Sequence, residues 1–167
     1  MDIELTQLAE QIGAALNSRG LMLASAESCT GGWVGEVVTS VAGSSHWYDR
    51  GFITYTNESK QEMLGVTAHT LAEFGAVSEQ TVREMAAGAL KHSCAHITLA
   101  ISGIAGPGGA TPGKPVGTVC MAWATRNGAG QSQTLHFQGD RTAVRRQAVV
   151  AVLQGVLRMI EGETGTA

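Results

Sequence analysis

The chain has 167 residues, 44% hydrophobic and 15% charged, which favours one domain over residues 1–167 with a sizeable core. Its formal net charge of −3 gives no general basic surface, so nucleic acid is a poor candidate for a partner. No apolar run approaches the roughly 20 residues of a membrane span, and the N-terminus lacks the apolar core of a signal peptide. Three cysteines, an odd number without paired spacing, indicate reduced thiols in a cytoplasmic protein.

The first half of the chain alternates helices and strands. Apolar residues at three- and four-residue spacing predict an N-terminal amphipathic helix that stops at Gly20. A strand over 21–26, a helix over 33–41 and a strand over 51–56 follow. A short helix with Asn57 as its cap then completes this half.

The second half begins with a helix and contains a hairpin. Its predicted elements are a helix over 79–93 capped by Ser78, a strand over 96–102, a Gly/Pro loop over 103–115, strands over 116–124 and 133–138, and a last helix capped by Asp140, with a frayed tail over 162–167. Alternating strands and helices imply parallel pairing, and the hairpin must add an antiparallel strand. We therefore expect an α/β fold: a three-layer α/β/α sandwich with a mixed, mostly parallel sheet of about five strands.

Ligands of such sheets bind beyond the carboxyl ends of the strands. Three polar stretches are predicted to meet there: "AESCTGG" (26–32), "TYTNESK" (54–60) and "SGIAGPGG" (102–109). This convergence makes the edge of the sheet the expected functional site.

The stretch "SCTGG" combines three adjacent hydroxyl or thiol groups with the start of a helix. A helix start leaves backbone N–H groups free, which suits an anion or a developing oxyanion. Gly31 and Gly32 would let a ligand approach the backbone closely. The pattern leaves two alternatives open: a nucleophile among Ser28, Cys29 and Thr30, or only a helix cap.

A serine nucleophile needs a base, and none of the five histidines lies in a convergent turn with an acid nearby. Lys60, just past the second strand, is the other candidate, with Tyr55 as a proton relay. A lysine acts as a base when burial or a nearby cation lowers its pKa. The alternative is a solvated lysine on a short helix, which the local pattern favours.

Two patterns resemble ligand motifs but do not complete them. Residues 108–114 match the start of a phosphate-binding P-loop, but Pro115 stands where Ser or Thr must hold magnesium. His92, Cys94 and His96 have zinc-like spacing, but no fourth ligand is visible. We therefore expect neither a nucleoside-triphosphate site nor a metal site.

Two further features suit an anionic ligand. Ser102, Gly103 and Gly106, after a buried strand, could form a backbone nest for phosphate or carboxylate, or only a flexible loop. Arginines in the first turns of the last helix oppose its dipole, which indicates anionic partners, unless the helix face is solvated and paired with acids. They are Arg141, Arg145 and Arg146.

Long collinear segments resemble one known family. They include "AESCTGGWVGEVVTSVAGSSHWYDRGFITYTNESKQEMLGV", "GAVSEQTV", "AISGIAGPGG", "KPVGTV" and "GDRTAVRRQA". Together they resemble the C-terminal domain of the competence/damage-inducible protein CinA, and more closely its stand-alone form, the nicotinamide-nucleotide amidases. We expect only this amidase module, without the other CinA domain.

The resemblance implies a fold like that of anticodon-binding domains, and hydrolysis of the carboxamide of nicotinamide mononucleotide to nicotinate mononucleotide and ammonia. It implies no metal or organic cofactor, and a catalytic set matching Ser28, Tyr55 and Lys60. With that set, Thr30, Gly31 and Gly32 become candidates for substrate and oxyanion binding. Ser102, Gly103, Gly106 and Arg145 are then candidates for the substrate phosphate.

Three further expectations concern partners and alternatives. We expect a homodimer, because α/β modules of this size often self-associate. A pyridine-nucleotide-binding module without catalysis is one alternative function. A DNA-associated competence factor is another, which the acidic composition argues against.

Overall fold

A five-stranded sheet forms the centre of the protein in the computed structural model, which describes residues 2–164. Its strands are β1 (Leu23–Glu27), β2 (Tyr48–Ile53), β3 (Ile97–Gly103), β4 (Thr118–Thr125) and β5 (Gly130–His136), in the order β2-β1-β3-β4-β5. β1 pairs in parallel with β2 and β3, whereas β4 runs antiparallel to β3 and β5. The predicted mixed sheet of five strands is confirmed, with two parallel and two antiparallel strand pairs.

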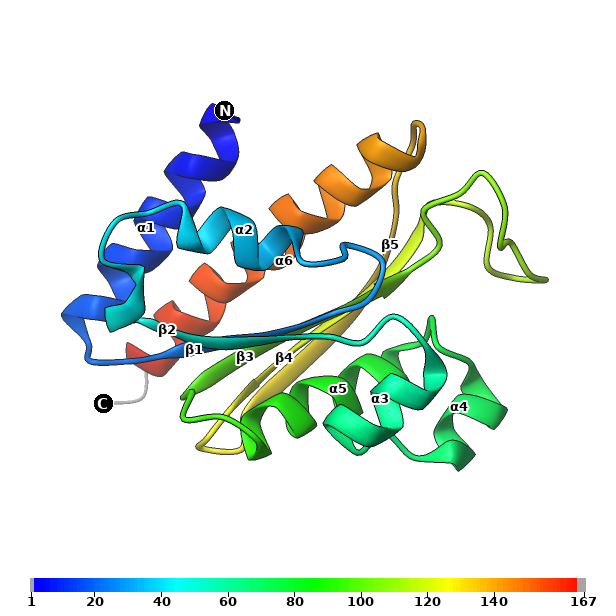
Figure 1. Ribbon diagram of the computed structural model, residues 1–167, viewed down its shortest axis with the longest axis horizontal. Coiled ribbons are helices and arrows are strands. Elements are labelled where there is room, and N and C mark those ends of the chain that lie inside the picture. The colour runs from blue at the N-terminus through cyan, green and yellow to red at the C-terminus, as the bar shows by residue number, and fades with distance from the viewer. Residues whose placement is uncertain (1, 165–167) are drawn as a thin grey trace.

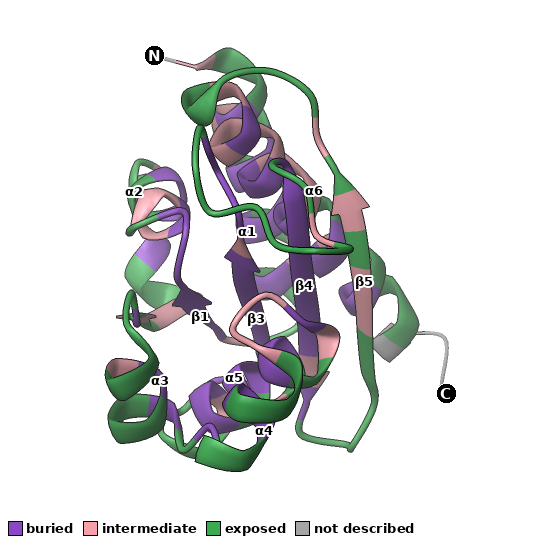
Figure 2. Ribbon diagram, turned by 90° about the vertical axis from the view of Figure 1, so that its right-hand side faces the viewer, coloured by how far each residue is buried: buried purple, intermediate pink, exposed green. Residues whose placement is uncertain are grey.

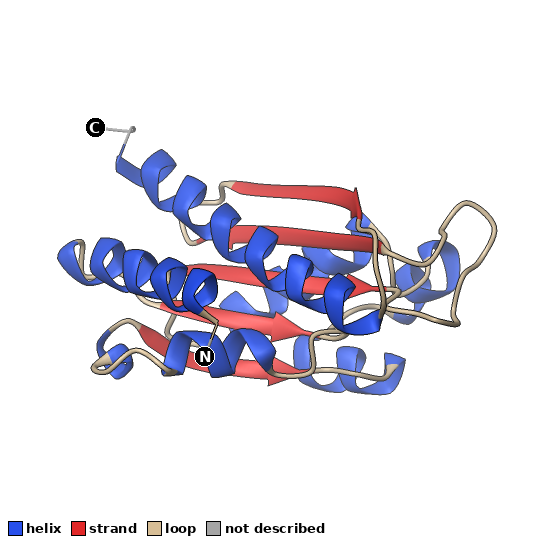
Figure 3. Cartoon of the chain, turned by 90° about the horizontal axis from the view of Figure 1, so that it is seen from above, coloured by secondary structure: helices blue, strands red, loops and turns tan. Residues whose placement is uncertain are grey.

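Helices cover both faces of this sheet (Figure 1). The first group lies on one face and comprises α1 (Ile3–Ser18), α2 (Trp33–Thr39) and α6 (Arg141–Thr164). The second group lies on the opposite face and comprises α3 (Asn57–Leu64), α4 (Ala68–Phe74) and α5 (Glu79–Lys91). Figure 3 shows the first group in front of the five strands, so the predicted α/β/α layering is confirmed.

Some local predictions differ from the structure. α4 and the short 3₁₀ helix η1 (Ser44–His46) were not expected, because neither segment carries a full helical repeat of apolar residues. β2 was expected over 51–56, but begins at Tyr48 and ends at Ile53. The cap of α3 is Thr56, whose extended backbone lets its Oγ accept a hydrogen bond from the Ser59 N–H, while Asn57 is already helical.

The C-terminal boundary also differs. α6 continues to Thr164, past the start of the predicted frayed tail, and residues 165–167 lie outside the described part of the chain. The expected cap is present, because the Ala143 N–H donates to Asp140 Oδ1 over 2.9 Å.

The two faces of the sheet carry side chains of different size. The strands present Ile97, Leu99 and Ile101 to the core beneath α1, α2 and α6, and Ala100 to the core beneath α5. Figure 2 shows β1, β3 and β4 as mostly buried, while β5 is mixed along the edge. Successive residues of a strand point to opposite faces, so β3 is apolar on both sides, as a central strand must be.

The strand register aligns the carboxyl ends of the three parallel strands. Glu27, the last residue of β1, pairs with Ile53 of β2 and with Ile101 of β3. Ser28 is the first residue after β1, and Thr54 is the first residue after β2. Both therefore leave the sheet at the same end, the one formed by the carboxyl ends of these strands. The convergence predicted from the sequence thus follows directly from this register.

A tight contact between α6 and β4 gives a stability prediction. A Cβ at Gly155 would lie 2.0 Å from Cζ2 of Trp123, whose indole N–H already donates to the Val152 carbonyl. We expect Gly155→Ala to lower the free energy of unfolding by about 1–3 kcal/mol, because the ring cannot retreat without loss of this bond. Urea denaturation measures the change. Gly162→Ala, in the same helix with open space around it, is the control and should cause no loss; equal effects would contradict the prediction.

Candidate active site

Ser28 and Lys60 meet at the carboxyl edge of the sheet. Lys60 Nζ lies 3.0 Å from Ser28 Oγ and 2.8 Å from the Thr54 carbonyl oxygen. Ser28 follows β1, and Lys60 is on the first turns of α3, which begins four residues after β2 ends. A hydroxyl and an amine are therefore held within hydrogen-bonding distance by two neighbouring strands.

Lys60 is almost entirely buried, with 1% of its surface exposed. No carboxylate forms an ion pair with it among residues 2–164. Burial therefore lowers the pKa of its ammonium below the ordinary value, because the charged form loses solvation without gaining a counter-ion. The neutral amine has a lone pair, so it can accept the Ser28 proton while still donating to Thr54.

The carboxylate of Glu27 organises the turn between β1 and α2. Its side chain is 2% exposed, and its Oε1 accepts hydrogen bonds from the Thr30 hydroxyl and from the N–H groups of Gly32 and Val34. Its Oε2 accepts from the Gly35 N–H. An internal anion therefore occupies the N-terminus of α2, where the sequence predicted a ligand. Sequence reasoning missed this role, although an acid just before a helix start is a recognisable pattern.

The N–H groups of the turn are not all available to a ligand. Gly31 donates to the Ser28 carbonyl and Gly32 to Glu27, so two of the three predicted candidates, Thr30, Gly31 and Gly32, already have internal acceptors. Their positive φ angles of 59° and 104° are instead what the turn requires of these glycines. Within the described residues, the N–H groups of Cys29 and Thr30 have no oxygen acceptor.

Cys29 packs into the core beneath α2 and α6. Burial is the main cause that raises the pKa of its thiol, to about 11. The thiolate, which is the reactive form, is therefore scarce at neutral pH. This environment favours Ser28 over Cys29 as the nucleophile.

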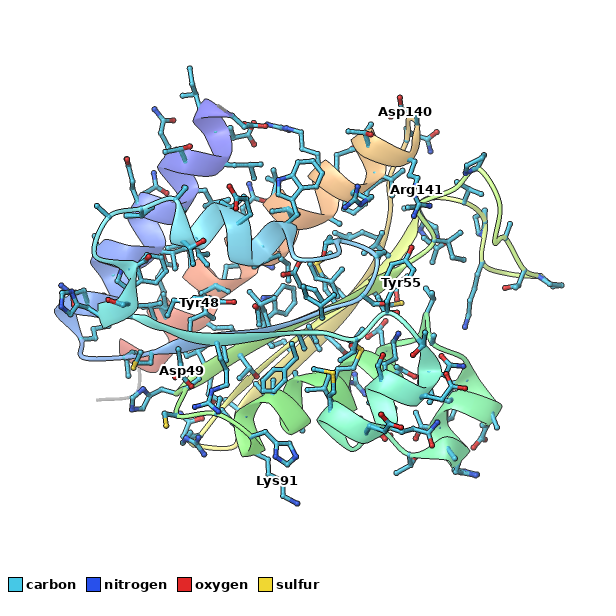
Figure 4. The ribbon with its side chains drawn as sticks, in the orientation of Figure 1. Tyr48, Asp49, Tyr55, Lys91, Asp140 and Arg141 are labelled. Carbon is cyan, nitrogen blue, oxygen red and sulfur yellow. The ribbon has the colours of Figure 1, made fainter. Side chains whose placement is uncertain are left out.

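Tyr55 and Arg141 lie next to each other at this edge (Figure 4). Arg141 Nη2 donates to the Tyr55 hydroxyl over 3.0 Å, and its Nη1 donates to the Gly106 carbonyl over 2.8 Å. Tyr55 is 59% exposed and has no hydrogen bond to Ser28 or Lys60 among the described residues. The structure thus connects the predicted relay residue to an arginine that the sequence did not assign.

Arg145, the arginine predicted to bind phosphate, instead supports the turn. Its Nε donates to the Cys29 carbonyl and its Nη2 to the Thr30 carbonyl, and its guanidinium lies 5.5 Å from the centre of the Trp33 ring. It does not line the cavity beside Ser28. Of the three arginines at the start of α6, Arg146 forms ion pairs with Asp2 and Glu4. This is the alternative arrangement in which an arginine of this helix pairs with acids of the protein itself.

A cavity of about 190 Å³ opens beside Ser28 and Lys60. Its lining residues are Ser28, Cys29, Tyr55, Asn57, Lys60, Ala76, Val77, Ser102, Gly103, Ala105 and Arg141. Ser102 and Gly103 therefore lie where the sequence placed them, whereas Gly106 contributes through its bond to Arg141. The lining contains the Arg141 guanidinium, the Lys60 amine, several apolar groups and no carboxylate.

Among the side chains that the structure describes, those of residues 2–162, no group of three or more His, Cys, Asp or Glu is arranged to hold a metal ion. No helix in that range is both long and apolar enough to cross a bilayer. Lys114, the lysine of the incomplete P-loop pattern, donates to the Phe74 carbonyl.

Comparison with known proteins places the chain in a family. A model described as the CinA C-terminal domain matches residues 5–160. The chain is 57% identical over 153 residues to the nicotinamide-nucleotide amidohydrolase PncC of Escherichia coli K12, covering 92% of this chain and 93% of that protein. A protein of the same name from Pseudomonas putida is 44% identical over 155 residues, covering 93% and 96% respectively.

A solved structure agrees with these sequence matches. The competence/damage inducible protein CihA from Agrobacterium tumefaciens has a TM-score of 0.92 at 43% identity, covering 95% of this chain and 96% of that one. The protein belongs to the CinA C-terminal domain family. The resemblance seen in the sequence is confirmed.

The buried carboxylate of Glu27 gives a second prediction. Glu27→Ala should lower the free energy of unfolding by about 3 kcal/mol or more, because several buried donors lose their acceptor at once. Glu27→Gln should lose less, since one amide oxygen can still accept the three bonds made by Oε1. Thermal and urea unfolding measure both. Glu36→Ala, which removes an exposed acid from α2, the helix whose first N–H groups donate to Glu27, is the control, and a loss as large there would refute the role of Glu27.

Proposed function

We propose that this protein is a nicotinamide-nucleotide amidase that hydrolyses the carboxamide of nicotinamide mononucleotide to nicotinate mononucleotide and ammonia. One observation carries the proposal: Lys60 Nζ, buried and without a counter-ion, lies 3.0 Å from Ser28 Oγ. The 57% identity to a nicotinamide-nucleotide amidohydrolase supports the choice of substrate. The carboxamide of that substrate would lie against Ser28, with its ring beside Ala76, Val77 and Ala105.

The proposed reaction proceeds through an acyl-enzyme. Ser28 Oγ attacks the carboxamide carbon while its proton passes to the neutral amine of Lys60. The C–N bond then breaks, and the nitrogen takes this proton from Lys60 and leaves as ammonia. Water attacks the resulting ester, gives a proton to Lys60, and Ser28 Oγ recovers a proton as nicotinate mononucleotide leaves.

The oxyanion of each tetrahedral intermediate needs donors near Ser28. We assign the N–H groups of Cys29 and Thr30 to this role, because Gly31 and Gly32 already have internal acceptors. A donor on the residue after the nucleophile is a recurrent arrangement in hydrolases. One such donor contributes about 3–4 kcal/mol to the stability of the transition state.

The cellular setting and assembly state are part of the same proposal. A cytoplasmic enzyme is supported by three free cysteines, of which Cys94 is exposed. A homodimer is supported by exposed apolar side chains at Ile53 and Met63, the first of them on the edge strand β2.

Substitution of the nucleophile tests the proposal directly. Ser28→Ala should reduce release of ammonia and nicotinate mononucleotide by about 10³-fold or more, with folding intact. Cys29→Ala, the matched control in the same turn, should be comparatively mild, because the Cys29 thiol stays protonated. Circular dichroism verifies folding of each variant. Absence of turnover by the folded parent protein would refute the function, and loss of activity only in Cys29→Ala would transfer the nucleophile to that residue.

The pH dependence of the reaction tests Lys60. Only its neutral form can accept the Ser28 proton, so kcat/KM should rise with pH through the pKa of Lys60 and then level off. Because burial lowers that pKa, the plateau should be reached below the pH at which a solvated lysine titrates, about 10.4. Lys60→Met, which removes the base but keeps the length of the side chain, should cost about 10²–10⁴-fold. A wild-type profile that still rises at the pKa of a solvated lysine would show that Lys60 is not the base.

A further inference from the structure

Tyr55 and Arg141 form a pair of donors at the mouth of the cavity. Because the Tyr55 oxygen accepts a bond from Arg141 Nη2, its own O–H remains able to donate. The guanidinium of Arg141 has more N–H donors than its two bonds to Tyr55 and Gly106 use. Both groups therefore offer hydrogens, which a negatively charged oxygen can accept.

The charge around this pair also favours an anion. No carboxylate lies within ion-pair distance of Arg141 among residues 2–164. The neighbouring acid, Asp140, instead caps α6 by accepting from the Ala143 N–H. Arg141 is therefore a fixed cation in a cavity whose lining contains no acid.

The dimensions of the cavity require part of the substrate to extend outward. A volume of about 190 Å³ is below the usual range of roughly 300–1,000 Å³ for sites that enclose a whole ligand. With the carboxamide at Ser28, the remainder of a nucleotide must leave past the rim. Three separate segments line that cavity: Ser28 follows β1, Tyr55 follows β2, and Arg141 begins α6.

We infer that Arg141 and the Tyr55 hydroxyl form the subsite that binds the substrate's phosphate. This inference rests on the proposed function and deepens it. The planar guanidinium can bind two phosphate oxygens at once, and Tyr55 holds its orientation while donating to the same group. Tyr55 is thereby a substrate-binding residue and not the proton relay of the reaction.

A second cation site lies close enough to be a rival. Lys114 lines a separate cavity of about 500 Å³ that shares the Val77 wall with the catalytic one. That cavity also contains the carboxylate of Glu79, and Lys114 Nζ donates to the Phe74 carbonyl. An acid in the lining disfavours phosphate, so Arg141 is the better assignment.

Binding of two ligands that differ only in the phosphate tests the subsite. Calorimetry on the Ser28→Ala protein compares nicotinamide mononucleotide with nicotinamide riboside. Adding Arg141→Ala should weaken binding of the mononucleotide by about 10- to 100-fold and leave the riboside nearly unchanged. Arg141→Lys, which keeps the charge but not the planar fork, should recover part of the loss. Lys114→Ala and Arg19→Ala, which each remove one cation elsewhere, should change neither affinity.

Kinetics on both substrates then separate the two roles of Tyr55. Tyr55→Phe should raise KM for the mononucleotide by a larger factor than it lowers kcat, whereas loss of a proton relay would lower kcat on both substrates. The subsite is overturned if Arg141→Ala weakens both ligands equally, if Lys114→Ala carries the loss, or if the Ser28→Ala protein does not bind the mononucleotide. Phosphate-dependent binding without ammonia release from either substrate by the wild type would instead reject only the amidase function.

Discussion

The buried carboxylate of Glu27 is the constraint on which the rest of the site depends. It accepts hydrogen bonds from N–H groups at the start of α2. These groups have no acceptor within the helix, so a buried helix terminus needs an acceptor from elsewhere. Glu27, the last residue of β1, faces α2, while Ser28, the first residue after the strand, faces Lys60 of α3. The hydrogen bonds of Glu27 on the α2 side therefore also hold Ser28 on the α3 side, beside Lys60.

The two buried ionisable groups near Ser28, Glu27 and Lys60, have opposite surroundings. The Glu27 anion is surrounded by donors, whereas the Lys60 amine has only two oxygen partners and no acid. A buried cation without a counter-ion is costly, and the molecule meets that cost by favouring the neutral amine. Burial therefore increases the share of Lys60 that carries a free lone pair, the form that the proposed reaction requires.

The three arginines at the start of α6 have different partners. Arg145 binds the carbonyls of Cys29 and Thr30, and so ties α6 to the turn. Arg146 ties α6 to the start of α1 through Asp2 and Glu4. Arg141 alone reaches the cavity, on the same helix face as Arg145 but one turn earlier, where the helix passes the edge of the sheet. Helical spacing placed all three together but did not distinguish their partners.

The sequence by itself determined the α/β/α layering, the three stretches that converge on one edge, and the pairing of Ser28 with Lys60 once the family resemblance was added. The layering and the convergence follow from hydrophobic periodicity and from the succession of strands and helices, which are local properties of the chain, whereas the pairing is what the resemblance implies. Only the tertiary structure decided which N–H groups remain free, that Lys60 is buried, and that Arg141 rather than Arg145 lines the cavity. Burial and hydrogen-bond partners depend on residues distant in the sequence, such as Arg145 and Thr30, and no local pattern contains them.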